Sequence, residues 1–235
     1  MMTADDTGIG LLVFDRPEHT KQVLNGLKRN EVDKLYVFAD GPEPGQELES
    51  IEATRDVVQD VDFCDIELII KDDNYGVQRM WVDAYDCIFE NHKKAIILED
   101  DCVPASDFVG YMQTCLDYYE DHKRVMNVQG YCPPIEIPAE YSYDVFFTWR
   151  SGSWGQGTWK KAWEKLRRDP SIRQKIKEDK DLRRAVKRAG WDLIPMLEKE
   201  IDDEINSIGV WWSLTLARCS GVSVNPVRSR IKNIG

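Results

Sequence analysis

The chain has 235 residues, of which 42% are hydrophobic, and its net charge is −11. These values suit one large folded domain, or a domain with an appendage. No apolar run approaches the roughly 20 residues that a membrane-spanning helix needs, and the polar, acidic residues 1–6 do not form a signal peptide. The acidic balance argues against nucleic-acid binding.

The charge is unevenly distributed along the sequence. Residues 160–190 hold 13 Lys/Arg against 5 Asp/Glu, a local balance of +8, which leaves about −19 for the remainder. A solvated helical face is the simplest interpretation of this basic stretch. The alternative is peripheral contact with an anionic membrane, or contact with a phosphate-bearing acceptor.

The six cysteines show no CxxC pair and no regular spacing, and the three histidines are scattered. This pattern indicates free thiols and argues against a zinc site. Together with the composition, it favours a cytoplasmic protein that is soluble or peripheral to the membrane.

Strand and helix patterns alternate through about residue 130. We expect strands at residues 8–14, 34–39, 65–70, 95–98 and 124–129. We expect helices at residues 20–30, 46–61, 77–88 and 106–119, with Thr20 and Ser106 as N-caps. The alternation predicts an α/β fold with a mostly parallel sheet and helices on both faces.

The pattern changes after residue 130, where an irregular passage rich in proline begins. We expect a short strand at residues 145–148 and then charged helices to about residue 204. Residues 210–216 fit either a strand or a helix. Pro226 interrupts the strand expected at residues 222–227 and indicates an edge position.

Three consecutive carboxylates, Glu99, Asp100 and Asp101, directly follow the apolar strand at residues 95–98. Because these like charges repel one another, the arrangement suits either an exposed turn or a bound cation. The three earlier strands also end in polar residues, at 15–16, 40–41 and 72–74. Ligands bind at the carboxyl ends of parallel strands, so we expect the four strand ends to form one crevice.

The usual glycine-rich phosphate loops, GxGxxG opening a helix and GxxxxGK[ST], are absent from the sequence. A diphosphate in the crevice would therefore need a divalent metal as its counter-charge. Oxygen ligands with open water positions suit Mn²⁺ or Mg²⁺.

Three tryptophans alternate with glycines and small polar residues at 149–159. Tryptophan offers an apolar plate on which a sugar ring can stack, and glycine lets the backbone approach a ligand closely. A purely structural Trp-Gly turn explains the segment equally well.

These motifs together resemble the GT-A glycosyltransferases, and in particular a bacterial branch similar in outline to the N-acetylglucosaminyltransferase I type. The resemblance rests on Phe14-Asp15-Arg16-Pro17-x-x-Thr20, Ala39-Asp40-Gly41-Pro42, Asn74-Tyr75-Gly76, Ile97-Leu98-Glu99-Asp100-Asp101 and Ser153-Trp154-Gly155-x-x-Thr158-Trp159. It implies a Rossmann-like GT-A fold. Residues 1–130 would form the nucleotide-sugar-binding half, and residues 131–235 a smaller acceptor-side half of the same domain.

By this resemblance, Asp101 would be the direct metal ligand. The nucleotide-sugar would be bound by Phe14, Asp15, Arg16, Asp40, Gly41, Asn74, Gly76, Arg79, Glu99 and Asp100. Trp154 and Gly155 would lie near the transferred sugar and the acceptor.

The chain departs from the family pattern around the catalytic base. Related sequences tend to carry an Asp and a Trp at positions 206–208, and an Arg near Trp211. Asp203 and Glu204 are nearby substitutes for the base, although the acids of residues 198–204 fit a solvated helix face equally well. Family members also tend to continue past residue 235 with a Gly- and His-containing segment, so we expect part of the site to be missing.

The resemblance implies a metal-dependent, inverting glycosyltransferase that moves a hexosyl or N-acetylhexosaminyl group from a UDP-sugar to a hydroxyl of a glycan or lipid-linked acceptor. Two alternatives remain open. One is a non-catalytic module that binds a sugar-nucleotide or a glycan. The other is a nucleotidyltransferase, which usually needs a Gly- and Lys/Arg-rich loop after the first strand, and Asp15-Arg16-Pro17 is a poor version of that loop.

Overall fold

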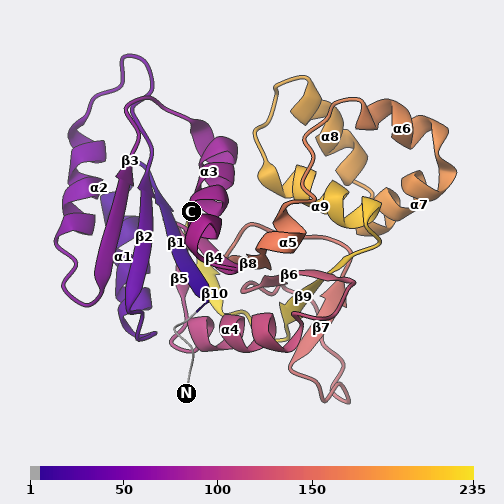
Figure 1. Ribbon diagram of the computed structural model, residues 1–235, viewed down its shortest axis with the longest axis horizontal. Coiled ribbons are helices and arrows are strands. Elements are labelled where there is room, and N and C mark those ends of the chain that lie inside the picture. Colours follow the sequence, from indigo (N-terminus) through magenta and orange to yellow (C-terminus); the bar gives the residue numbers. More distant parts are fainter. Residues whose placement is uncertain (1–5) are drawn as a thin grey trace.

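The computed structural model describes residues 6–235 (Figure 1). The strands are β1 Thr7–Val13, β2 Lys34–Ala39, β3 Asp65–Ile70, β4 Lys94–Glu99, β5 Cys102–Pro104, β6 Val125–Gln129, β7 Val145–Thr148, β8 Gln156–Trp159, β9 Val222–Pro226 and β10 Ile231–Asn233. The helices are α1 Pro17–Lys28, α2 Glu49–Gln59, α3 Gly76–Asn91, α4 Phe108–Tyr118, α5 Lys160–Trp163, α6 Ile172–Glu178, α7 Lys180–Ala189, α8 Leu193–Ile201 and α9 Ile208–Arg218.

Eight of the strands form one sheet in the order β3-β2-β1-β4-β8-β6-β9-β7. All run parallel to one another except β8 and β7, which pair antiparallel to their neighbours. Strands β5 and β10 form a separate antiparallel ribbon. The predicted α/β fold with a mostly parallel sheet is confirmed, and the arrangement agrees with a Rossmann-like GT-A fold.

The core lies on both sides of the central strands β1 and β4, which are almost entirely buried. Helix α3 packs against β1 and β4, and α4 packs against β6 and β8. The predicted inward face of α3 is buried from Met80 to Ile88, but Val77 is 45% exposed. Val77 differs because it lies in the first turn of α3, where it lines a cavity.

Both predicted helix caps are wrong. Helix α1 begins at Pro17, and Thr20 is buried inside it. The fixed φ of proline suits the first helical position, which explains the earlier start. Helix α4 begins at Phe108 with Asp107 at the N-cap position, and Ser106 precedes it.

The predicted edge position of the strand near Pro226 is also wrong. Strand β9 lies between β6 and β7, and β7 is the edge. Pro226 is tolerated because it is the last residue of β9, opposite Val145 at the start of β7. Residues 210–216 belong to the buried helix α9, and β5, β8 and β10 had not been predicted.

All six cysteines are free thiols, as expected. Within residues 6–235, no helix combines the length and the apolar character required to cross a membrane.

Candidate functional site

The ends of the first four parallel strands meet at one edge of the sheet. Val13 of β1 pairs with Ala39 of β2, and Ala39 pairs with Ile70 of β3. On the other side of β1, Leu12 pairs with Glu99 of β4. The polar segments that follow these strands therefore converge, as the sequence predicts.

A cavity of about 400 Å³ opens at this edge. Nine of the residues predicted to form the site line it: Phe14, Asp15, Arg16, Asp40, Asn74, Gly76, Glu99, Asp100 and Asp101. Gly41, Arg79, Trp154, Gly155, Asp203 and Glu204 are not part of its lining. The structure thus brings together the strand-end residues and leaves the acceptor-side residues apart from this cavity.

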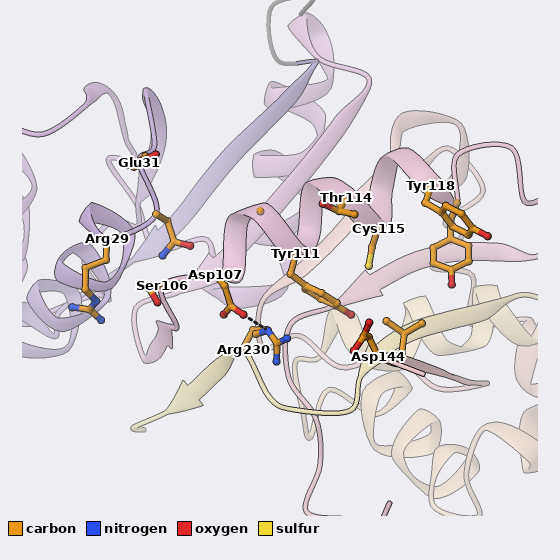
Figure 2. Close-up of a pocket in the computed structure, with 14 residues that line it drawn as sticks. Arg29, Glu31, Ser106, Asp107, Tyr111, Thr114, Cys115, Tyr118, Asp144 and Arg230 are labelled. Carbon is orange, nitrogen blue, oxygen red and sulfur yellow. Dashed lines mark ion pairs between the residues drawn. The ribbon is translucent and has the colours of Figure 1, made fainter. Parts of the chain in front are cut away.

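A larger cavity, of about 730 Å³, lies between the end of α1, helix α4 and the start of β7 (Figure 2). Arg230 forms part of its wall, with Nε 2.9 Å from Oδ2 of Asp107. None of the predicted site residues lines this cavity. Its size alone does not make it the functional site, because the converging acidic side chains lie elsewhere.

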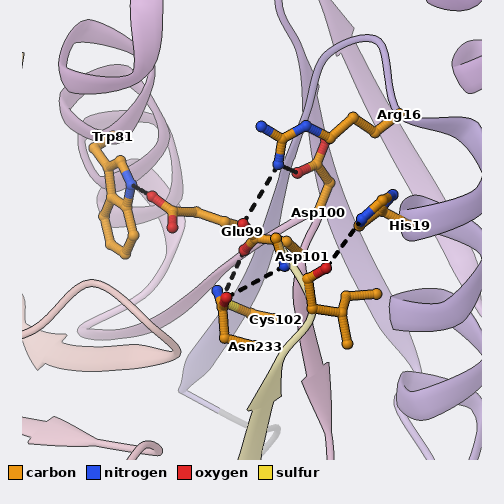
Figure 3. A network of polar contacts seen from close by, with 10 residues as sticks. Arg16, His19, Trp81, Glu99, Asp100, Asp101, Cys102 and Asn233 are labelled. Atoms are coloured by element: carbon orange, nitrogen blue, oxygen red, sulfur yellow. Dashed lines mark hydrogen bonds and ion pairs between the residues drawn. The ribbon is translucent and has the colours of Figure 1, made fainter.

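Arg16 lies within ion-pair distance of two of the three acids at the end of β4 (Figure 3). Nη1 of Arg16 lies 3.7 Å from Oδ1 of Asp100 and 3.4 Å from Oδ2 of Asp101. Glu99 accepts a 2.7 Å hydrogen bond from Nε1 of Trp81. Arg16 is half-exposed, so it compensates only part of the negative charge.

Burial raises the pKa of two of these carboxyl groups. The pKa of Glu99 rises to about 7, because burial and the charges of Asp101 and Asp100 outweigh the hydrogen bond from Trp81. The pKa of Asp100 rises to about 6, because burial outweighs the attraction of Arg16. The site therefore favours added positive charge, whether protons or a metal cation.

Glu99, Asp101 and Cys102 place one ligand atom each within 4.8 Å of one another. The Cys102 thiol is buried and donates to Oδ1 of Asp101 at 3.3 Å. The two carboxylates offer hard oxygen donors beside a water-accessible cavity, which fits Mn²⁺ or Mg²⁺. The structure therefore shows a group of side chains that could hold a metal ion, and the assignment of Asp101 as the metal ligand stays a prediction.

The end of the chain packs against the acids, which the sequence did not reveal. The β5–β10 ribbon carries Ile234 to the backbone of Asp101, where the Ile234 N–H donates to the Asp101 carbonyl at 2.9 Å. Nε2 of His19 lies 3.2 Å from the carbonyl oxygen of Ile234. A Cβ on Gly235 would lie 2.2 Å from Oδ2 of Asp101, so residues 234–235 border the acidic site directly.

Asp40 organises the turn that leads into α3. Its buried carboxylate accepts hydrogen bonds from the N–H groups of Tyr75 at 2.8 Å, Gly76 at 3.0 Å and Gly41 at 2.9 Å. The side chain of Asn74 donates to the Gly41 carbonyl at 2.9 Å. In the structure, Asp40 therefore holds the wall of the cavity together, and its predicted contact with the nucleotide remains a prediction.

Gly41 and Gly76 sit where a side chain would not fit easily. A Cβ on Gly41 would lie 2.4 Å from the backbone of Asp73. Gly76 has φ +69°, and a Cβ there would meet the amide nitrogen of Asn206 at 3.0 Å. The loop containing Asn206 consequently lies against the rim of the cavity.

Asp15 and Arg79 have partners within the protein. Nε2 of Gln46 donates to Asp15 at 3.1 Å, which ties the loop after β2 to the loop after β1. The guanidinium of Arg79 lies 3.5 Å from the ring centroid of Tyr75, on which it stacks. Arg79 is therefore held at the side of α3 and outside the cavity lining.

Trp154 and Gly155 lie at the same edge of the sheet, because the next residue, Gln156, pairs with Ile97 near the end of β4. The Trp154 ring is 37% exposed and packs edge-to-face on Tyr131, with centroids 4.6 Å apart. Gly155 has φ +70°, which favours glycine. A partly exposed tryptophan thus lies at the same edge of the sheet as the acids.

A buried polar cluster fixes the start of this Trp-Gly segment. Oγ of Ser151 accepts hydrogen bonds from Asn127 at 2.8 Å and Gln129 at 2.9 Å, both on β6. Ser223 on β9 donates to Oδ1 of Asn127 at 2.6 Å. The alternation along β6 placed these polar residues on one face, but nothing in the sequence revealed their shared partner.

Asp203 and Glu204 are exposed in the turn that follows α8. Neither side chain has a hydrogen-bond or ion-pair partner within the described residues. The buried acid of this region is instead Glu200, which accepts from Gln78, from the Ser207 N–H at 2.9 Å and from Nε1 of Trp211 at 2.8 Å.

Glu200 is not among the site residues predicted from the sequence, although its spacing in the helix indicates burial. It lies three and seven residues after Leu197 and Leu193, on the buried stripe of α8. Its hydrogen bonds link α8, α9 and α3, and they fix the loop that reaches the cavity rim.

No protein-family model matches the chain, and no curated protein matches it. Solved structures with a similar chain course include 4-diphosphocytidyl-2C-methyl-D-erythritol synthase from Anaerococcus prevotii, at 10% identity and TM-score 0.48, covering 98% of this chain and 92% of that one.

Two further solved structures have a similar chain course. One is the mannosyltransferase PcManGT from Pyrobaculum calidifontis in complex with GDP-Man and Mn²⁺, at 11% identity and TM-score 0.48, covering 93% of this chain and 74% of that one. The other is S. aureus TarS 1-349, at 8% identity and TM-score 0.44, covering 95% of this chain and 59% of that one. At these identities and scores, none of the likenesses identifies the activity of this chain.

Proposed function

We propose that this chain is a metal-dependent glycosyltransferase that moves a sugar from a UDP-sugar to an acceptor hydroxyl with inversion at the anomeric carbon. The observation that carries the proposal is the convergence of nine predicted donor-site residues on one cavity at the carboxyl edge of the sheet. Ligands of open α/β sheets bind at this edge.

Asp101 and Glu99 are the residues that would hold Mn²⁺ or Mg²⁺ in this site. When bound, such an ion supplies positive charge for the diphosphate of the donor and of the departing UDP. Arg16 adds a second positive charge, at 3.4 Å from Asp101. The turn held by Asp40 gives the pocket a fixed wall for the nucleoside, with Asn74 and Gly76 at its surface.

On the acceptor side, we assign to Trp154 and Gly155 the contacts with the transferred sugar and the acceptor. A carboxylate, Glu204 or Asp203, would accept the proton of the attacking hydroxyl. Their exposure and lack of partners leave both side chains accessible to an acceptor. A glycan or a lipid-linked sugar is the acceptor class that fits this arrangement, and the cytoplasm remains the predicted location.

The test is release of UDP from a panel of UDP-hexoses and UDP-N-acetylhexosamines with Mn²⁺, with and without simple sugar acceptors. The proposal expects turnover for at least one donor, loss of turnover in EDTA, and loss in Asp101→Asn. Tight binding of UDP with no hydrolysis or transfer of any donor would favour the non-catalytic module. Pyrophosphate release from a nucleoside triphosphate would favour a nucleotidyltransferase.

A further inference from the structure

The basic stretch of the sequence becomes a single exposed row in the structure. The row begins at the end of α6, follows α7 and ends just beyond it, at spacings of three, four, three, one and three residues. Every member is exposed: Lys177, Lys180, Arg184, Lys187, Arg188 and Trp191. The spacings within α7 place Lys180, Arg184, Lys187 and Arg188 on one face of that helix, and Lys177 precedes them at the end of α6, before the extended Asp179. We call these six residues the basic face.

The opposite side of α7 belongs to the core. Val186 and Ala189 are buried, and α7 packs against α9 and α8. The helix is therefore fixed to the protein, with its charged side turned to solvent. A partner that contacts α7 therefore meets its charged surface, and no apolar face of this helix is free to insert into that partner.

Most of the charge on the basic face is uncompensated. Lys177, Lys180 and Lys187 have no ion-pair partner within residues 6–235. Arg184 approaches Asp181 at 3.4 Å, but both side chains are largely exposed, so this pair is weak. The neighbouring acid Asp179 accepts from two backbone N–H groups as the N-cap of α7.

Trp191 ends the row and is 86% exposed. Its indole makes no ring contact and no hydrogen bond within the described part of the chain. Tryptophan is enriched at membrane–water interfaces, where its amphipathic ring lies at the level of the lipid headgroups. An exposed indole that follows a helix with four exposed cations is thus chemistry that suits an anionic bilayer better than a soluble polyanion.

We propose that the basic face docks the protein on an anionic membrane surface, with Trp191 entering the headgroup layer. The charge distribution supports this orientation, because residues 160–190 carry +8 and the remainder −19. An anionic surface attracts the basic face and repels the rest of the molecule.

Docking in this way would bring the acceptor side close to the lipid. Asp192, next to Trp191, pairs with Arg150 at 2.7 Å, and the Arg188 guanidinium lies 4.8 Å from the Trp149 ring centroid. Both contacts join the basic face to the segment that leads to Trp154. If the proposed function holds, the acceptor is therefore lipid-linked.

The test is flotation of the whole chain with vesicles of 30% phosphatidylglycerol in phosphatidylcholine, compared with pure phosphatidylcholine, at low and high salt. We expect binding to the anionic vesicles only, weakened by salt. Each surface cation contributes roughly a fivefold factor, so Lys180→Gln/Arg184→Gln/Lys187→Gln should lower the partition coefficient about 100-fold. Trp191→Ala should weaken binding without changing its salt dependence.

Two control variants remove the same types of side chain elsewhere on the protein. Lys21→Gln/Lys28→Gln/Lys93→Gln removes three exposed cations from the other half of the chain, and Tyr118→Ala removes an aromatic ring that is 68% exposed. Both should bind like the unaltered chain. Absence of anionic-vesicle binding, or equal losses in the control and test triples, would overturn the proposal. The proposal would also be overturned if the chain bound polyglutamate as strongly as anionic vesicles and if Trp191→Ala left vesicle binding unchanged. Vesicle binding needs no turnover, so its outcome is separate from that of the transfer assay.

Discussion

Nε1 of Trp81 on α3 donates a 2.7 Å hydrogen bond to Oε1 of Glu99 at the end of β4. This bond couples a core helix to the acidic cluster, since the Trp81 ring is buried and cannot follow a displaced carboxylate. It also stabilises the charged form of Glu99 and so opposes the effect of burial on its pKa. If a metal binds here, the hydrogen bond from Trp81 would hold the Glu99 carboxylate in place and keep it charged.

Trp81→Phe should therefore weaken Mn²⁺ binding about tenfold at pH 7, because Glu99 loses its donor and its pKa rises further. Isothermal titration calorimetry at pH 7.0 and 8.5 measures this, and the deficit should shrink at the higher pH. Trp163→Phe is the control, since it removes a similar indole bond to Asp86 away from the acids. Equal affinities in the two variants would contradict the coupling.

The raised pKa values of Glu99 and Asp100 predict how stability depends on pH in the metal-free protein. The folded state keeps protons that the unfolded state has already released, from about pH 4 to pH 7. The free energy of unfolding should therefore fall as pH rises through this range, with a contribution of about 3 kcal/mol from Glu99. Above about pH 8 both groups are ionised in the folded and the unfolded state, and they should add no further dependence.

Urea denaturation in EDTA at several pH values measures this dependence, and Glu99→Gln isolates it because the variant cannot titrate there. The difference in unfolding free energy between the original chain and the variant should change between pH 4.5 and 7. Added Mn²⁺ should stabilise the original chain more as pH rises, because binding displaces the protons. A difference that stays constant with pH would rule out the raised pKa of Glu99.

Glu200 and Glu204 should respond differently to the same substitution. Glu200→Gln replaces a buried acceptor of three hydrogen bonds with an amide, and should cost about 1–3 kcal/mol of stability. Glu204→Gln alters an exposed side chain and should leave the melting temperature unchanged. If Glu204 is the proton acceptor, the second variant should lose kcat while retaining UDP binding. Full turnover in Glu204→Gln would transfer the role to Asp203.

Gly41→Ala tests the close backbone approach in the cavity wall. Its Cβ would lie 2.4 Å from Asp73, so the turn must shift, at a cost of about 1–3 kcal/mol, and donor binding should weaken. Gly110→Ala is the matched control, because Gly110 lies in α4 with no atom near its Cβ position. That change should stabilise the protein by about 0.5–1 kcal/mol. Thermal melts of both variants provide the comparison, and equal effects would refute the packing argument.

The sequence predicted the first half of the fold and the donor-side convergence well. Strands such as Lys34–Ala39 and Asp65–Ile70 are short apolar runs bounded by turn residues, and their parallel order places their ends at one edge. The location of the acids 99–101 at this edge of the sheet follows from the parallel order of the strands. Local patterns suffice for β1, β2 and β3, which pair in sequence order, whereas β4 pairs with the distant β1.

The remainder depends on contacts that are distant in the sequence. Glu200 is buried because Trp211 and Gln78 donate to it, and neither partner is visible from the charged block in which it occurs. Strand β8 is short, contains glycine and inserts antiparallel between β4 and β6. The exposure of Trp191 could not be predicted either, since a tryptophan after a helix usually packs.

The most direct test of the central claim is calorimetric titration of UDP into the chain with and without Mn²⁺, comparing the original sequence with Asp101→Asn and with Asp121→Asn, a control at an exposed acid outside the cavity. We expect UDP to bind only when Mn²⁺ is present, with binding retained in Asp121→Asn and lost in Asp101→Asn. UDP binding that is equally strong in EDTA, or unchanged in Asp101→Asn, would contradict a metal-dependent nucleotide-sugar site at the acids.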